Sequence, residues 1–242
     1  MEASSYAFTV GLRATRDAFA RWQRRPLPVV GRWALGSLAT AAFMLVAVWV
    51  ISMLDSSASA PVPMLPPFVV GGPSDVVSLL EHNGLVLALH SLACLAGFIA
   101  GSSLPLQAGD RTGVSRWVHV HGGRIAIGFV VAATTFSLSV QTWVLGHSLA
   151  RISGNLHVSP GLILIGVLPH AVLELTALFL PLAAWILASR RGAWDELLAA
   201  TIVTTAIAIP MLVVAAIIEV YLSPHVFQAV TGAHIVYYSV SP

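Results

Sequence analysis

The residues best suited to chemistry are a histidine and a glutamate inside a long apolar segment. His170 and Glu174 are four residues apart, and the residues around them predict a membrane-spanning helix. This spacing places both side chains on one face of a helix, one turn apart. Ionisable side chains at this depth are costly unless paired, and they often mark a functional site. Pro169 removes a helical hydrogen bond directly before the histidine and favours a kink there.

Three further polar residues are expected close to these two. His90 is predicted about six residues from the outer end of the second spanning helix, and His170 about nine from the outer end of the fourth. Glu219 lies near the outer end of the fifth, and Asn83 at the outer mouth of the second. At about 1.5 Å per residue, all of them belong to the outer half of the membrane. The sequence therefore predicts a polar cluster beneath the external surface.

Three activities suit such a cluster. Imidazoles and carboxylates can bind a zinc-like divalent metal and activate water, with His170 and Glu174 as ligands and Glu219 completing the catalytic set. The same groups can instead relay protons or bind a substrate, with Asn83 and His90 as binding residues. A hydrogen-bonded latch that fixes helix register is the third alternative. The spacing lacks the built-in general base of a His-Glu-x-x-His motif, so it leaves open whether the protein is an enzyme.

Composition places these residues in a lipid environment. The chain is 57% hydrophobic and 9% charged, and its mean hydropathy is +0.86. Soluble domains carry roughly a quarter charged residues, so this composition is typical of an integral membrane protein. The pI near 9.1 comes mainly from arginines at one end and does not indicate nucleic-acid binding. No phosphate-binding loop occurs in the sequence, so ATP energy would have to come from a partner.

Long apolar runs predict an all-α, polytopic bundle of about five transmembrane helices. The predicted spans are residues 33–53, 84–104, 122–145, 161–187 and 197–222. Arginines concentrate before the first span and in the second and fourth connections, whereas the other side carries only Arg151. The positive-inside rule then places the N-terminus in the cytoplasm and the C-terminus outside a bacterial cell membrane.

The remaining segments are predicted to lie at the membrane surface. Residues 1–29 form a cytoplasmic amphipathic helix, because Phe8, Leu12, Phe19 and Trp22 recur at helical spacing. Residues 30–222 form the bundle, and residues 223–242 an external interfacial tail. Residues 55–83 are rich in proline and lack basic residues, so an irregular external loop is expected. Within the bundle, the small residues at 97 and 101 favour close helix packing.

Four pieces of sequence, in this order, resemble one family of bacterial membrane proteins. The first is Asn83 with Gly97 and Gly101, and the second is residues 122–128. The third is the motif Leu168-Pro169-His170-x-x-x-Glu174-Leu175. The fourth is residues 215–224, which end in Glu219-x-Tyr221-x-Ser223-Pro224. Over roughly residues 75–230 the chain is similar to the stage II sporulation protein M family, which includes relatives encoded beside circular bacteriocins. The family usually has glycine where this chain has Ala171. The resemblance implies that Asn83, His170, Glu174 and Glu219 are the family's polar residues.

The resemblance also implies a role in transport or in assembly at the membrane. We expect an integral membrane subunit of an export or envelope-remodelling complex that handles a peptide or lipid-like substrate through the outer-half cluster. The alternatives are an intramembrane peptidase or peptide cyclase, and a non-catalytic scaffold that recruits cell-wall hydrolases. Like a permease of an ABC exporter, the chain would form a homodimer or join a partner membrane subunit. A cytoplasmic ATPase would bind the N-terminal helix and the loops with Arg111, Arg116, Arg190 and Arg191.

Overall fold

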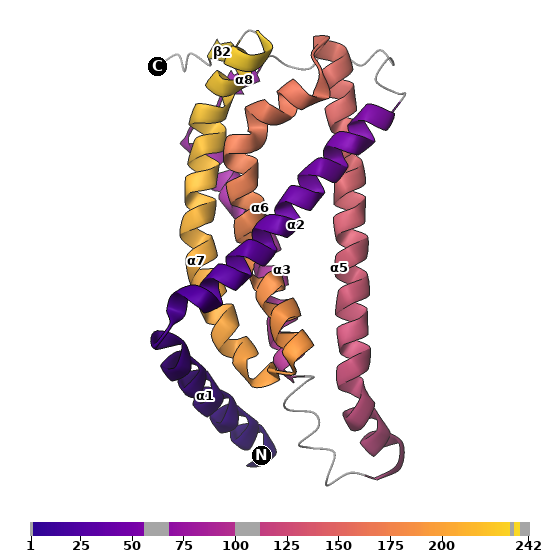
Figure 1. Cartoon of the computed structure of the whole chain (residues 1–242), viewed down its shortest axis with the longest axis vertical. Coiled ribbons are helices and arrows are strands. Elements are labelled where there is room, and N and C mark those ends of the chain that lie inside the picture. Colours follow the sequence, from indigo (N-terminus) through magenta and orange to yellow (C-terminus); the bar gives the residue numbers. More distant parts are fainter. Residues whose placement is uncertain (1, 56–67, 100–111, 233–234, 238–242) are drawn as a thin grey trace. The chain divides into compact units, whose positions relative to one another are not determined.

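The computed structural model describes residues 2–55, 68–99, 112–232 and 235–237, and they are almost entirely helical (Figure 1). Arg111 lies outside the described residues. In chain order the elements are α1 (Glu2–Gln23), α2 (Pro26–Leu54), β1 (Phe68–Val70), α3 (Pro73–Phe98), α5 (Gly113–Leu156), α6 (Pro160–Arg191), η4 (Trp194–Glu196), α7 (Leu197–Ile217), η5 (Ile218–Leu222), α8 (Ser223–Thr231) and β2 (Ile235–Tyr237).

Five stretches of the described chain are long and apolar enough to cross a membrane. They are Pro26–Leu54, Pro73–Phe98, Ile127–Leu156, Pro160–Arg191 and Trp194–Thr231. A helix satisfies every backbone polar group internally, which an apolar solvent requires of a spanning segment. The predicted all-α bundle of about five spans is therefore confirmed, although most helices extend beyond the predicted boundaries.

The start of α3 corrects the predicted external loop. Residues 73–83 were expected to be irregular, but they form the first three turns of α3. Pro73 opens the helix at a position where its missing N–H costs nothing. Asp75 lies in the first turn and its Oδ2 accepts a hydrogen bond from the backbone N–H of Gly72, at 2.7 Å. A helix therefore begins where the proline content suggested that none would.

The fifth span continues past its predicted end at residue 222. After α7, which contains Pro210, the chain makes one wider π-helical turn, η5, and then continues as α8. Gly232 has a φ of 72° and donates its N–H to the carbonyl of Gln228, which ends the helix. Beyond it, β2 pairs in parallel with β1, so that Phe68 lies opposite Ile235.

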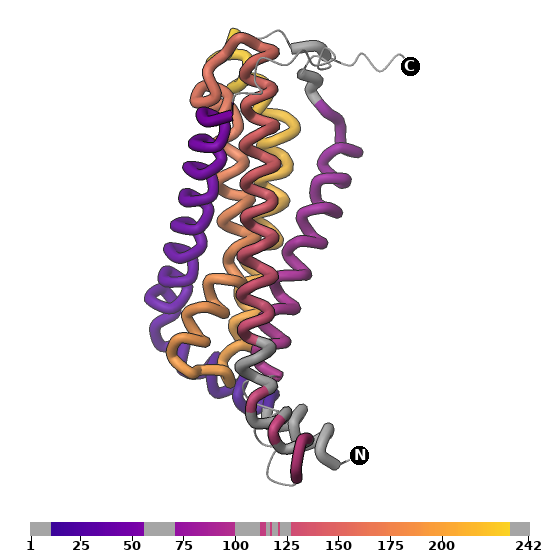
Figure 2. The backbone as a smooth tube through the Cα atoms, turned by 90° about the vertical axis from the view of Figure 1, so that its right-hand side faces the viewer, coloured from indigo at the N-terminus to yellow at the C-terminus, as the bar shows by residue number. Residues whose placement is uncertain are grey.

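The described helices divide into two compact units. The first contains Met1–Ser37, Leu85–Thr135 and Leu178–Ala208, and the second contains Leu38–Gly84, Phe136–Ala177 and Ile209–Pro242. Each of the five spanning stretches contributes residues to both units, whereas α1 lies wholly in the first. In the first unit, the end of α6 turns through η4 into α7. The two helices run side by side in opposite directions (Figures 1 and 2).

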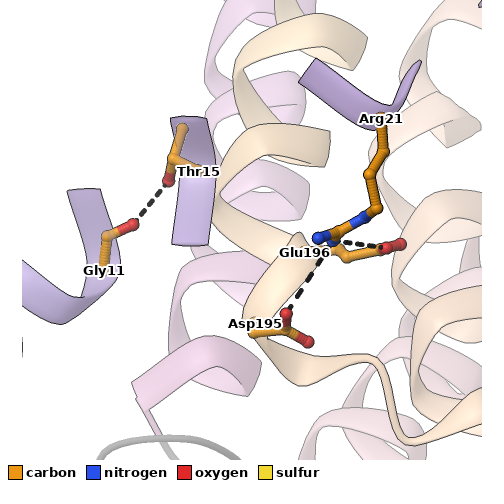
Figure 3. Close-up of polar contacts among 5 residues, drawn as sticks. All are labelled: Gly11, Thr15, Arg21, Asp195 and Glu196. Atoms are coloured by element: carbon orange, nitrogen blue, oxygen red, sulfur yellow. Dashed lines mark hydrogen bonds and ion pairs between the residues drawn. The ribbon is translucent and has the colours of Figure 1, made fainter. Parts of the chain in front are cut away.

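In the first unit α1 packs through its small residues. Gly11, Thr15 and Ala18 are buried at helical spacing, whereas Leu12 is 50% exposed. The Thr15 hydroxyl bonds back to the Gly11 carbonyl, and Arg21 reaches across to η4 (Figure 3). Its Nη2 lies 2.9 Å from Oε1 of Glu196 and 3.9 Å from Oδ2 of Asp195. This pair is exposed and contributes little stability, so the small-residue face holds α1.

Close helix packing in both units depends on glycines. In the first unit, a Cβ on Gly97 would overlap the indole ring of Trp185, and the predicted packing role of this glycine is confirmed. In the second unit, a Cβ on Gly166 would lie 3.2 Å from the Cα of Phe227 in α8. Phe227 belongs to a buried cluster with Val48, Leu149 and Ile163. The second unit is therefore packed around the end of the fifth span.

The contact at Gly97 predicts a difference between two glycine substitutions. Gly97→Ala should lower the free energy of unfolding by about 1–3 kcal/mol, because the added methyl group overpacks the Trp185 contact. Gly128→Ala is the matched control, since a Cβ there meets no atom within 4 Å. It should be neutral or stabilise by up to about 1 kcal/mol. Unfolding of the detergent-solubilised protein measures both, and equal effects would contradict the packing role.

Candidate functional site

The second unit brings together most of the predicted polar residues. Asn83 comes from α3, His170 and Glu174 come from α6, and Glu219 comes from η5. Asn83 is only 5% exposed, and its side chain forms a hydrogen bond with the Glu174 carboxylate. A buried amide of this kind requires a partner, because in an apolar environment an unmade hydrogen bond is not replaced by water. The contact joins the second and fourth spanning helices.

His170 has a partner that sequence reasoning did not single out. Its Nδ1 lies 2.6 Å from Oγ of Ser223, the first residue of α8, and Ser223 is buried. Either the hydroxyl donates to the ring nitrogen or the ring N–H donates to the hydroxyl oxygen. The available signal was the family-like ending Glu219-x-Tyr221-x-Ser223-Pro224, in which the serine follows the glutamate by four residues.

Glu219 lies on the π-helical turn η5. Such a turn widens the helix locally and is frequent at functional sites, because it changes the direction in which a side chain points. The Glu219 carboxyl group interacts electrostatically with that of Glu174, and both residues line the same cavity. Two carboxyl groups near one another repel when both are charged, and a cation between them relieves that repulsion.

A cavity of about 310 Å³ opens onto these polar groups. Its polar lining residues are Ser148, His170, Glu174 and Glu219, and we call it the polar cavity. The rest of its wall is apolar and comes from α2, α5 and α6, with Met44, Leu45, Val48, Leu145, Leu149, Ile152, Ile163, Leu164, Val167, Ala171 and Leu175. Cavities of a few hundred Å³ with an apolar wall and a few polar groups are the usual form of small-ligand sites.

Residues 118–224 match the family model described as Stage II sporulation protein M. Over this segment, the chain is similar to the stage II sporulation protein M family. The family segment contains His170, Glu174, Glu219 and Ser223, whereas Asn83 precedes it. The comparisons with curated proteins and with solved structures gave no match. The five spanning helices and this similarity indicate a multi-pass membrane protein.

His90 is in the other unit, and its contacts are different. Its Nδ1 lies 2.8 Å from the carbonyl oxygen of Leu178 in α6, and since a carbonyl only accepts, Nδ1 carries the proton. One turn further along α3, the Cys94 thiol donates to the carbonyl of Pro181, at 3.1 Å. The structure thus joins α3 to α6 through His90 and does not bring His90 into the hydrogen bonds of Asn83 and His170. Its substrate-binding role stays a prediction.

The predicted zinc-like metal would need a third ligand beside His170 and Glu174. Among the residues that the structure describes, no three His, Cys, Asp or Glu side chains gather in a set that could hold a metal ion. One ring nitrogen of His170 is also engaged by Ser223, and Glu174 bonds Asn83. The zinc-like metal therefore stays a prediction.

The contact between His170 and Ser223 predicts a measurable coupling. Ser223→Ala should lower the free energy of unfolding by about 1–3 kcal/mol, because a half-buried imidazole loses its hydrogen-bond partner. In the double variant with His170→Ala, the two effects should deviate from their sum by about 0.5–3 kcal/mol. Ser78→Ala, at an exposed position of α3, is the matched control. Strict additivity would show that the two side chains do not act together.

Proposed function

We propose that the protein is an integral membrane subunit of an export or envelope-remodelling complex that binds a peptide or lipid-like substrate in the polar cavity. The observation that carries this proposal is the cavity itself. It combines a long apolar wall with three ionisable groups, His170, Glu174 and Glu219, in the second unit. A substrate with an apolar chain and a polar end matches such a lining.

The position of the cavity supports handling of a substrate rather than a purely structural role. Polar residues within spanning segments commonly line substrate or ion pathways. All the polar lining residues lie in spanning helices, and the predicted topology would place His170, Glu174 and Glu219 in the outer half of the membrane. The hydrogen bonds of Asn83 and Ser223 hold two of these groups in place, which is how a binding site is kept ready for its ligand.

A partner in the membrane is part of the proposal. Ser137 and Gln141 are exposed on α5, and a hydrogen bond of 3.2 Å joins Nε2 of Gln141 to Oγ of Ser137. A polar face on a spanning helix favours packing against another helix. We propose that this face contacts a second copy or a partner subunit. On the side predicted to be cytoplasmic, Arg190 and Arg191 are exposed and suit the proposed contact with an ATPase.

One observation favours the enzyme alternative, an intramembrane peptidase or peptide cyclase. The Ser223 hydroxyl lies within hydrogen-bond reach of an imidazole, and such a base can activate a hydroxyl as a nucleophile. Two measurements on the purified protein decide it. Covalent labelling of Ser223 by a fluorophosphonate probe, lost in Ser223→Ala, supports serine chemistry, and a stoichiometric metal supports the metal version. With neither labelling nor metal, the enzyme alternative fails.

The proposal predicts loss of function without loss of assembly. Glu174→Gln and Glu219→Gln keep side-chain volume and remove negative charge from the polar cavity, so both should fail to complement a strain that lacks the protein. Their level in the membrane and their elution volume in detergent should equal those of the unchanged protein. Glu81→Gln, at an exposed position on α3, is the matched control and should complement fully.

Other outcomes of the same experiment select the remaining alternatives. Loss of the protein from the membrane in both cavity variants would favour the latch that fixes helix register. Full complementation by both, with unchanged recruitment of a cell-wall hydrolase, would favour the non-catalytic scaffold. Either result would contradict the proposed substrate-binding role of the cavity.

A further inference from the structure

A second cavity lies beside the first in the same unit. Its volume is about 270 Å³, and its lining is entirely apolar, so we call it the apolar cavity. The lining residues come from α2 and α6 and are Leu38, Ala42, Leu45, Val46, Trp49, Leu164, Leu168 and Val172. Their spacing of three, four or seven residues along each helix forms a single stripe per helix. The apolar cavity is therefore a seam between two spanning helices.

Two leucines separate the two cavities. Leu45 of α2 and Leu164 of α6 line both the apolar and the polar cavity, and both are half-buried. The two cavities thus share two flexible side chains in their linings. Changes of leucine rotamer would connect them, since exposed and half-buried side chains change rotamer rapidly.

The outer rim of the apolar cavity faces the membrane. Leu38, Val46 and Trp49 are 42%, 56% and 41% exposed, and all three belong to the spanning segment of α2. In that environment the neighbouring solvent is the hydrocarbon of the bilayer. An acyl chain is the partner that matches a rim and a lining whose exposed surface is apolar, because a peptide would bring backbone groups that need hydrogen bonds.

The lining of the polar cavity indicates the charge and chemistry of the headgroup that such a lipid would have. Its ionisable groups are His170, Glu174 and Glu219. The chain has no lysine, and among the described residues no arginine lines this cavity. A phosphate placed among these groups would need cationic donors such as arginine, so the terminal group of a lipid headgroup, and not its phosphate, is the part that fits them. Two neighbouring carboxyl groups instead attract a cation, and an ammonium group also donates hydrogen bonds to both.

We propose that the two cavities form one site for a lipid that carries a primary ammonium headgroup. Its acyl chain enters from the bilayer between α2 and α6 and displaces Leu45 and Leu164, and its ammonium group lies between Glu174 and Glu219. This inference rests on the proposed function and names the substrate class within it. The seam between α2 and α6 is then the lateral entrance to the polar cavity.

Photolabelling of the full chain in lipid vesicles tests this site. The probes are phosphatidylethanolamine and phosphatidylglycerol with identical diazirine-bearing acyl chains, and mass spectrometry locates the label. We expect phosphatidylethanolamine to label the lining of both cavities and phosphatidylglycerol to label it about tenfold less, a difference that corresponds to one hydrogen bond between charged groups. The combined Glu174→Gln and Glu219→Gln variant should lose this preference while the rim on α2 remains labelled.

A substitution at the shared wall tests the route. Leu164→Trp should reduce labelling of the α5 lining residues Leu149 and Ile152, because the larger ring blocks the passage between the cavities. Leu162→Trp is the matched control, since Leu162 is exposed on the same helix and lines neither cavity. It should leave the labelling pattern unchanged.

Three results would overturn the inference. The first is equal labelling by the two lipids, and the second is unchanged labelling of α5 in Leu164→Trp. The third is label spread evenly over exposed positions outside both cavities, such as Phe136. None of these results depends on complementation. Selective labelling of the unchanged protein that is lost in the combined variant, together with failed complementation by that variant, supports both proposals. Failed complementation by the cavity variants without selective labelling of the unchanged protein overturns the lipid assignment alone.

Discussion

Hydrocarbon provides no hydrogen bonds, so each polar group of a spanning helix depends on a partner within the protein. In the second unit this constraint is met by two side-chain contacts, Asn83 with Glu174 and His170 with Ser223. They connect α3 to α6, and α6 to the start of α8. The packing of Phe227 against Gly166 and the polar cavity both occur beside these contacts. Breaking either contact would leave a polar group in an apolar environment, which is costly.

Departures from regular helix accompany this site. Pro169 precedes His170 and cannot donate a backbone hydrogen bond, and η5 places Glu219 on a wider turn. A regular helix would keep side chains at fixed angles around its axis, whereas a local irregularity can redirect one of them. The polar groups of the cavity thus come from the places where α6 and the fifth span depart from ideal sequence or geometry, which is common at sites that bind ligands inside membranes.

The cavities give these polar groups a chemical context. The polar cavity alone suits many amphiphiles, because its lining combines an apolar wall with carboxyl groups. The adjoining apolar cavity narrows the choice, since its exposed lining surface is apolar and its rim residues Leu38, Val46 and Trp49 are exposed on a spanning helix. Similarity of residues 118–224 to the stage II sporulation protein M family adds a membrane setting but not a substrate. The lipid assignment therefore depends on cavity geometry and charge rather than on family.

The sequence by itself determined the membrane class, the approximate spans and the shared location of His170 and Glu174, because hydropathy and helical spacing are local properties. It did not reveal that residues 73–83 begin α3, since capping by Asp75 outweighs a proline-rich composition. Nor did it reveal Ser223 as the partner of His170, or the carbonyl of Leu178 as the partner of His90. Those contacts, and the two cavities, depend on which faces of different helices meet, and only the tertiary structure decided that.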